Sequence, residues 1–321
     1  MTTPEPTVGA SRLSIQAALY PLSMLVLLGT AWGLSFSLAK IATSAGHHPI
    51  GLLMWQAGGA AAITFSVILA RRKLGQLRLV NMRYYAFCGT VGIIVPSGAI
   101  YWASPHIPAG VLAILIATST IVTYALALVI RLERKSWRRV LGIMLGFIAV
   151  LLILGPDTSL PEPGMAGWAL VGMIAPLCYA INPLFIDRFR PLGTDSHVLA
   201  FGMLICAFAI ITPVALFGGT GFMPGPPWDR VDLAVFGMPV ITGCAMLIVF
   251  ELIRVSGPVY FSMVGYPITA GGVLWGWYLF DERLGPYIWL ALAFMLAGLT
   301  LVNLRRDKQQ TSSGGLHDTG K

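Results

Sequence analysis

Apolar segments long enough to cross a bilayer follow one another through nearly the whole chain, with only short connections between them. A helix needs about 20 predominantly apolar residues to span the hydrocarbon core. Only 11% of the 321 residues are charged and the mean hydropathy is +0.78, whereas soluble domains carry about 25% charged residues. Too few polar side chains remain to cover a water-soluble globule. The composition therefore predicts a polytopic membrane protein and excludes a secreted disulfide scaffold, a nucleic-acid-binding domain and a disordered chain.

Ten segments fit this length, so we predict an all-α membrane protein with ten transmembrane helices. The flanking residues 1–17 and 305–321 are polar and are expected to form tails. The remaining connections are too short to hold a soluble domain. The ten segments are residues 18–39, 50–70, 84–105, 108–130, 139–155, 166–186, 197–218, 231–253, 257–280 and 285–304.

The distribution of basic residues predicts the orientation of these segments. If the N-terminus is cytoplasmic, 18 of the 21 Lys and Arg residues lie in the tails and connections on the cytoplasmic side. Only Lys40, Arg230 and Arg283 then lie on the other side. Because basic residues are enriched in cytoplasmic loops, we expect a multi-pass protein of a bacterial inner membrane with both termini in the cytoplasm.

Short motifs recur in the two halves of the chain. Glu133-Arg134 precedes the fifth segment and Glu282-Arg283 precedes the tenth, 149 residues later. Trp32 in the first segment corresponds to Tyr179 in the sixth, at an offset of 147. We therefore predict two five-helix repeats, residues 18–155 and 166–304. Since five is odd, the second repeat is inverted, an organisation typical of secondary transporters with a substrate site near the midplane.

The motifs and their placement resemble the drug/metabolite transporter superfamily of the EamA type. Trp32-Gly33, the two Glu-Arg doublets and Pro267 carry the resemblance, which extends over residues 18–304. The first repeat departs from the second at Thr118, which occupies the position that matches Pro267. The resemblance implies a ten-helix inner-membrane carrier of small metabolites, often an exporter of amino acids or similar compounds.

Charged residues inside the apolar segments are scarce. The deepest are Glu251 and Arg254, which share a helix face near the inner end of the eighth segment. Charges within a membrane are costly and often functional, so Glu251 is a candidate proton-coupling carboxylate. The alternative is that Glu251 and Arg254 anchor the helix end. The two Glu-Arg doublets could form gates, but we expect Glu133 and Glu282 each to cap the N-terminus of the helix that follows.

Aromatic and amide side chains are the candidates for lining a substrate cavity. An amide in hydrocarbon needs a hydrogen-bond partner, so Gln56 and Asn182 should face the bundle interior. Aromatic faces hold apolar or cationic parts of a ligand. For Tyr101, Trp102 and Trp275, the sequence leaves open a place in the interfacial aromatic belt. The candidate lining residues are Trp55, Gln56, Tyr101, Trp102, Tyr124, Tyr179, Asn182, Tyr266 and Trp275.

The function favoured by these features is secondary transport of a small metabolite, an amino acid or related compound, by alternating access, with efflux as the expected direction. Import of a vitamin-sized heterocycle and a membrane-embedded enzyme are the alternatives. The sequence lacks nucleotide-binding GxxxxGK[ST], HExxH and GxSxG motifs. We expect no cofactor or metal and no nucleic-acid partner. The expected partners are the substrate and the lipid bilayer, with the protein a monomer or homodimer.

Overall fold

The computed structural model describes residues 8–129, 137–154 and 164–303, whose regular structure is entirely helical. Three 3-10 turns, Leu74–Gln76, Leu79–Asn81 and Ser262–Val264, and one π-helical turn, Thr90–Ile94, join or interrupt the α-helices. The α-helices are α1 (Val8–Ser44), α2 (Pro49–Ala70), α3 (Met82–Gly89), α4 (Val95–Ala103), α5 (Ala109–Val129), α6 (Trp137–Leu154), α7 (Met165–Gly172), α8 (Ile174–Phe189), α9 (Ser196–Phe217), α10 (Arg230–Phe261), α11 (Gly265–Phe280) and α12 (Pro286–Asn303).

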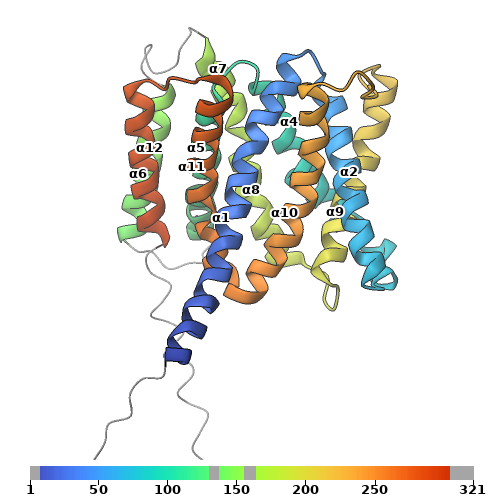
Figure 1. The fold of residues 1–321 in the computed structure, drawn as a ribbon, viewed down its shortest axis with the longest axis horizontal. Coiled ribbons are helices and arrows are strands. Elements are labelled where there is room, and N and C mark those ends of the chain that lie inside the picture. Colours follow the sequence, from blue (N-terminus) through green and yellow to red (C-terminus); the bar gives the residue numbers. More distant parts are fainter. Residues whose placement is uncertain (1–7, 130–136, 155–163, 304–321) are drawn as a thin grey trace, which may run out of the picture.

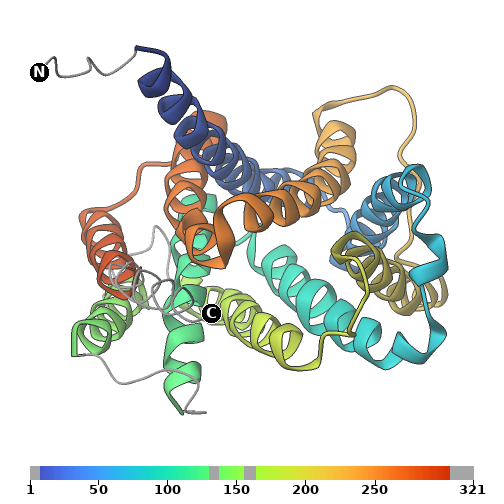
Figure 2. The ribbon, with the colours of Figure 1, turned by 90° about the horizontal axis from the view of Figure 1, so that it is seen from below.

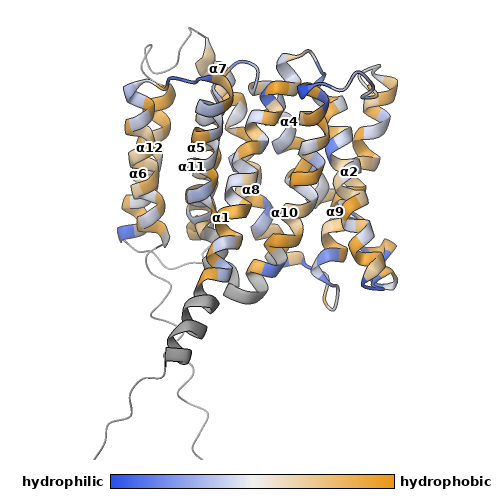
Figure 3. Ribbon diagram, in the orientation of Figure 1, coloured by the Kyte–Doolittle hydropathy of each residue, from blue (hydrophilic) through white to orange (hydrophobic). Residues whose placement is uncertain are grey.

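Length and apolarity confirm that this is a polytopic membrane protein. Among the described residues, seven helical segments are long and apolar enough to cross a membrane, and two further apolar helices, Val140–Leu154 and Pro286–Val302, are shorter. The apolar surface is turned outward, since Phe147, Leu170 and Leu274 are each about 60% exposed. Hydrophilic residues gather at the two ends of the helices (Figure 3). The seven segments are Leu19–Ser44, Pro49–Ala70, Leu79–Ala103, Ala109–Leu126, Met165–Ile186, Ser196–Phe217 and Arg230–Val249.

Two helices extend beyond the boundaries that we predicted. The first begins at Val8, so residues expected in the N-terminal tail are helical. Helix α10 continues to Phe261 across the expected connection at residues 254–256. Hydropathy indicates which residues can lie in the bilayer. It does not indicate where a helix ends, because a helix continues as long as its backbone hydrogen bonds continue. Polar residues such as Arg12 therefore mark the limit of the membrane without ending the helix.

The helices form two rows that are closed at each end by a helix pair (Figures 1 and 2). One row contains α11, α1 and α10, and the other contains α5, α8 and α4. The pair α6 and α12 lies at one end, and the pair α2 and α9 lies at the other. We call the side of Figure 1 that carries residues 44–49, 103–109 and 280–286 the upper end, and the side that carries residues 70–82 and 189–196 the lower end.

Close helix approach occurs where the sequence spaces glycines four residues apart. A Cβ on Gly33 of α1 would lie 2.5 Å from the backbone nitrogen of Gly272 on α11. Likewise, a Cβ on Gly142 of α6 would lie 2.7 Å from the carbonyl oxygen of Gly298 on α12. Side chains at these positions would force the backbones apart. The glycines thus permit the α1–α11 and α6–α12 contacts.

One interruption of the helices was not anticipated. The amide of Val95 bonds to the carbonyl of Thr90, five residues back, in the π-helical turn between α3 and α4. The cause lies in Pro96, which has no N–H to donate to the carbonyl of Gly92. Helices α7 and α8 are likewise separated at Met173. Both interruptions lie in neighbouring helices, because α4 packs against α7 and α8, and π-bulges occur frequently at functional sites.

Candidate functional site

Two predicted tyrosines lie together where α4 meets α8. Tyr101 of α4 and Tyr179 of α8 are close enough to interact electrostatically, and the Tyr179 hydroxyl is within hydrogen-bonding reach of Ser97. Tyr101 and Ser97 are 3% and 5% exposed. These side chains therefore lie inside the bundle. Aromatic residues of an interfacial belt would instead lie at its surface.

Asn182 lies one helical turn beyond Tyr179 on α8 and faces the π-helical turn. A Cβ on Gly92 would lie 2.7 Å from Nδ2 of Asn182, so the amide occupies the space that the glycine leaves. The other amide atom, Oδ1, is buried without a hydrogen-bond partner. An unpaired buried acceptor costs about 1–3 kcal/mol. A ligand that donates a hydrogen bond would remove this cost.

A second amide with an unpaired oxygen joins α2 to α10. Nε2 of Gln56 donates to Oγ1 of Thr242 at 3.1 Å, while Oε1 of Gln56 is buried without a partner. Leu53, one turn earlier on α2, lies 3.6 Å from the position of a Cβ on Gly98 in α4. Since α2 and α4 run in opposite directions (Figure 1), Gln56 is displaced from this contact toward the π-helical turn. The two unpaired amide oxygens thus lie on helices that each contact α4.

Three of the other predicted lining residues hold helices or loops together. The indole of Trp55 donates to the carbonyl of Phe222, at 2.9 Å, in the connection between α9 and α10. Trp275 of α11 donates to the carbonyl of Thr30 in α1 at 3.2 Å. The third, Tyr266, joins α11 to α12 through its hydroxyl, which donates to Oγ1 of Thr300 at 3.1 Å.

The remaining predicted residues have different environments. Tyr124 is buried in α5, whereas Trp102 of α4 is 40% exposed and meets the ring of His48 edge-on, with centroids 5.9 Å apart. Glu251 is half-buried near the lower end of α10. Of the predicted set, the structure therefore brings Tyr101 close to Tyr179, and Asn182 lies one helical turn further along α8.

We expected Glu282 to cap the helix that follows it, but it caps a different helix. Its carboxylate accepts hydrogen bonds from the backbone N–H groups of Ala109, at 2.8 Å, and Gly110, at 3.2 Å, which begin α5. It also pairs with Lys40 of α1 at 2.8 Å. The prediction considered only the next helix in sequence, whereas the capped helix lies more than 170 residues earlier in the chain. The corresponding Glu133 lies outside the described residues.

Cavities of ligand size lie among the residues that the structure describes. One, of about 420 Å³ at the upper end, is lined by Lys40, His106, Trp168, Glu282 and Leu284 among others. The ring of His106 stacks on Trp168 with centroids 3.9 Å apart. The second, of about 520 Å³, is an almost wholly apolar groove between α2 and α9, and its lining suits lipid chains better than a polar solute.

A polar cluster at the lower end joins the segment that follows α2 to the N-terminus of α9. Asp195 caps the N-terminus of α9 by accepting from the N–H of His197 at 2.9 Å, and it pairs with Lys73. The backbone N–H of Asp195 donates to Oε1 of Gln76 at 2.8 Å. Burial acts to raise the pKa of Asp195, but the hydrogen bonds from Lys73 and His197 outweigh it and lower this pKa to about 2.

His, Cys, Asp and Glu supply the possible metal ligands in the part of the chain that the structure describes, and the cysteines supply its thiols. Within residues 8–129, 137–154 and 164–303, His, Cys, Asp and Glu side chains form no group of three or more that could hold a metal ion. The four cysteines, Cys88, Cys178, Cys206 and Cys244, are free thiols. The features that the structure does offer are buried hydroxyl and amide groups inside a bundle of apolar helices.

A bundle of apolar helices with an apolar exterior defines an integral membrane protein. The family model of the EamA-like transporter family matches residues 19–155 and again residues 166–304. The chain therefore belongs to the EamA-like transporter family.

A curated relative and a solved structure resemble this chain. The chain is 27% identical over 189 residues, 58% of its length, to the "Uncharacterized transporter YyaM" of Bacillus subtilis (strain 168), and the match spans 61% of that relative's length. A solved crystal structure superimposes with a TM-score of 0.60 at 17% identity, covering 91% of this chain and 99% of the other. The likeness to the crystal structure concerns the fold alone.

Proposed function

We propose that this protein is a secondary transporter that exports a small amino compound, an amino acid or a relative of one, by alternating access. The proposed site lies near the midplane along the contact of α4 and α8, with Tyr101, Tyr179 and Asn182 as its proposed lining and Gln56 on the neighbouring helix α2. Trp55, Trp102, Tyr124, Tyr266 and Trp275 complete the proposed lining or support it. The proposed membrane is a bacterial inner membrane with both termini in the cytoplasm, which makes the upper end of Figure 1 the outer side.

The helix contacts support an architecture of ten spans in two inverted repeats. Let α1, α2, α3–α4, α5 and α6 correspond to α7–α8, α9, α10, α11 and α12. Then the α1–α11 contact corresponds to α8–α5, the α1–α10 contact to α8–α4, and the α2–α10 contact to α9–α3. Exchange of the two halves therefore reproduces the pattern of contacts. The two matches to the family model cover the same halves, and five helices in each half make the second one inverted.

The proposal of an amino compound as substrate rests on the unpaired oxygens of Gln56 and Asn182. Both are buried acceptors that lack a donor. An ammonium or amide group supplies several N–H donors at once. The neighbouring rings of Tyr101 and Tyr179 would also attract a cation through their faces. A ligand with an amino group fits both features.

Import of a vitamin-sized heterocycle remains a second candidate, supported by the pair of tyrosine rings. A flat heterocycle could stack on these rings and donate from a ring N–H to the amides. The two candidates make different demands on the ligand. The first requires an aliphatic amino group, whereas the second requires an aromatic ring.

A thermal-stability screen of the purified protein tests the proposal. Amino acids, amines, nucleobases and vitamins are added singly. A ligand at about 100 times its Kd stabilises the native state by about 2.7 kcal/mol. We expect amino compounds to raise Tm and the same compounds to exchange across proteoliposomes. Stabilisation by heterocycles alone would favour the second candidate, and exchange of none of these compounds would contradict both.

A further inference from the structure

We propose that Glu282 is the gate residue that closes the substrate route at the upper end of the bundle. The proposal rests on the proposed alternating-access transport and adds the residue that holds one side shut. It starts from the three groups that meet this carboxylate: the ammonium of Lys40 and the N–H groups of Ala109 and Gly110. These groups belong to α1 and α5, while Glu282 follows α11.

The carboxylate is almost fully satisfied where it lies. Oε1 accepts from Lys40 and from Ala109, each at 2.8 Å, and Oε2 accepts from Gly110 at 3.2 Å. The side chains of Glu282 and Lys40 are 8% and 19% exposed. A carboxylate at a helix N-terminus also interacts favourably with the helix dipole. Hydrogen bonds to charged groups in a poorly hydrated site are strong, so this contact holds α1, α5 and α11 together.

The local sequence turns Glu282 back toward these partners. Asp281 ends α11 in the left-handed conformation, with φ of 51°, and reverses the chain. Gly276, one turn and a half earlier, leaves the space that the carboxylate occupies, because a Cβ there would lie 2.4 Å from Oε2 of Glu282. The position of the carboxylate is therefore determined by two features of its own segment.

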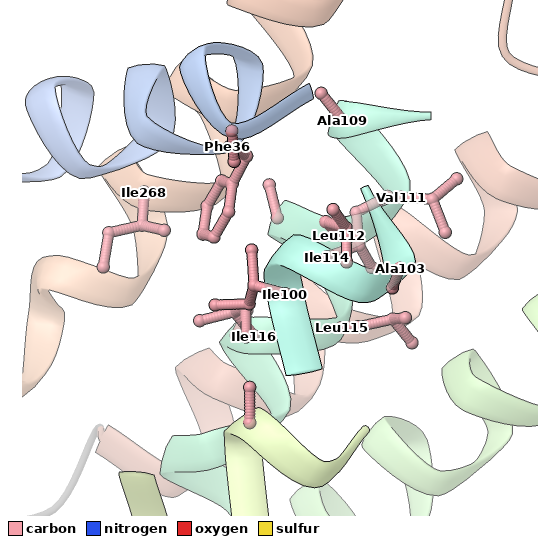
Figure 4. Close-up of a cluster of buried hydrophobic side chains, with 14 of the residues drawn as sticks. Phe36, Ile100, Ala103, Ala109, Val111, Leu112, Ile114, Leu115, Ile116 and Ile268 are labelled. Carbon is pink, nitrogen blue, oxygen red and sulfur yellow. The ribbon is translucent and has the colours of Figure 1, made fainter. Parts of the chain in front are cut away.

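The bundle beneath Glu282 is closed on the same side. Every residue of α5 from Ala109 to Leu115 is buried, whereas Val129 at the other end of this helix is 78% exposed. Phe36 of α1 and Ile100 of α4 pack around the upper part of α5 (Figure 4). The hydroxyls of Thr43 and Ser104 add a 2.9 Å hydrogen bond between α1 and α4. The two rows thus meet closely at the upper end.

If α11 separates from α1 and α5 at this end, all three contacts of Glu282 break. The cavity of about 420 Å³ lies beside them and includes both Lys40 and Glu282 in its lining. Water in this cavity can hydrate the two charges once they part, which limits the cost of opening. The contact is therefore stable when closed and can still be broken, as a gate requires.

Accessibility of a buried cysteine measures this gate without any substrate. The four native cysteines are replaced, and Ser97→Cys is introduced below the gate, where Ser97 is 5% exposed. A membrane-impermeant methanethiosulfonate is applied from the side that labels Ala45→Cys but not Gly75→Cys, which mark the upper and lower ends. We expect Glu282→Gln and Lys40→Met each to raise the labelling rate of the cysteine at position 97 by about tenfold, because loss of one partner favours the open state.

Arg283→Gln is the matched control, since it removes a charge from the next residue. The Arg283 side chain is 89% exposed and lies 4.0 Å from Asp281, so the labelling rate should not change. If Glu282→Gln does not fold, Lys40→Met serves alone, because Glu282 can still cap α5 in that variant. Equal rates in Lys40→Met, Glu282→Gln and Arg283→Gln would overturn the gate. Faster labelling from both sides, with a lowered Tm, would also overturn it, because the variants would then loosen the whole fold.

The labelling experiment tests the gate separately from the proposed transport function. A protein that transports none of the tested compounds could still show the labelling shift, which would support the gate alone. Transport with unchanged labelling in the gate variants would contradict the gate and leave the transport proposal intact.

Discussion

The amide of Asn182 fills the space beside Gly92, where a Cβ would lie 2.7 Å from Nδ2. This contact joins the π-helical turn before α4 to the middle of α8. Asn182 gains a fixed position from it, yet its Oδ1 stays without a partner. A polar group that is held in place but unsatisfied is suited to receive a ligand, because no rearrangement is needed before binding.

Gly92→Ala is expected to weaken substrate binding while the protein still folds. The new methyl group would push against the Asn182 amide and displace it, at a cost of about 1–3 kcal/mol typical of overpacking. The measurement is the ligand-induced rise in Tm for a compound that the stability screen identifies. Gly98→Ala is the control on α4, because the nearest side-chain atom to its Cβ lies 3.6 Å away. Equal ligand responses in the two variants would show that the Asn182–Gly92 contact does not shape the site.

Asn182→Leu is expected to separate stability from function. The substitution removes a buried oxygen that has no partner, so Tm without ligand should stay the same or rise by a few degrees. Ligand binding and exchange should be lost. Thr64→Val is the control, since the Thr64 hydroxyl is buried but bonds only to carbonyls of its own helix, and it should leave binding unchanged. A large fall in Tm of Asn182→Leu would assign the amide a structural role instead.

Hydropathy predicted the membrane segments because it acts over a few turns of one helix. The apolar segments define the regions able to cross a bilayer, and Gly33 and Gly142 lie where two helices approach closely. The π-helical turn was missed although Pro96 was visible. A missing N–H shows that the hydrogen-bond ladder is disturbed, but not how the helix repairs it.

The sequence pattern could not predict contacts between segments that are distant in the chain. Nothing in the chain near Glu282 indicates that its partners are Lys40 and the first residues of α5, because these meet only when the two rows assemble. Tyr179 and Asn182 were proposed from their polarity inside an apolar segment. Their neighbours Gly92 and Ser97 carried no comparable signal, since small residues in a membrane helix usually serve packing.

The Lys73–Asp195 pair should stabilise the protein only above the acid range. The hydrogen bonds from Lys73 and His197 lower the pKa of Asp195 to about 2 despite burial. A lowered folded-state pKa gives stability that is present above the unfolded-state pKa, about 3.9, and is lost as the pH falls through about 2. Asp195→Asn keeps a good helix cap and should cost about 1 kcal/mol at pH 6 after allowance for solvent screening.

Unfolding of the two proteins in detergent between pH 6 and pH 2.5 tests this expectation. The difference in stability between wild type and Asp195→Asn should shrink as the pH falls below about 4. Lys73→Met should show the same trend, because it removes the other partner of the pair. A difference that is constant over this range would mean that Asp195 acts through its cap alone.

The proposed inverted architecture makes a direct prediction for loop accessibility. Single cysteines at Gly75 and Leu192, which lie at the lower end, should react only with reagents on the cytoplasmic side. Cysteines at Ala45 and Trp228 should react only from the outside. Leu192 and Trp228 are 99% and 60% exposed, so burial would not mask either site. Labelling of the positions 75 and 192 from opposite sides would contradict ten spans in two inverted halves.

Glu251→Gln is expected to leave the pH dependence of transport unchanged. Thr242, which pairs with Gln56, is nine residues earlier on α10. At a rise of 1.5 Å per residue, the two positions are about 14 Å apart along the helix. Glu251 is half-buried and close to the lower end, where it has interactions of its own. A carboxylate at this distance does not touch a ligand held by Gln56, so its charge is expected to anchor the end of the span.

Proteoliposome assays distinguish anchoring from proton coupling. Uptake driven by a pH gradient is compared with exchange at equal pH, because the amide of Gln keeps the shape of Glu but cannot titrate. An anchoring role predicts that both activities persist, with a loss of stability of about 1 kcal/mol or less. Asp232→Asn at the opposite end of α10 is the matched control for charge removal. Loss of gradient-driven uptake with intact exchange, in Glu251→Gln alone, would instead identify Glu251 as the proton-coupling group and the protein as a proton-coupled antiporter.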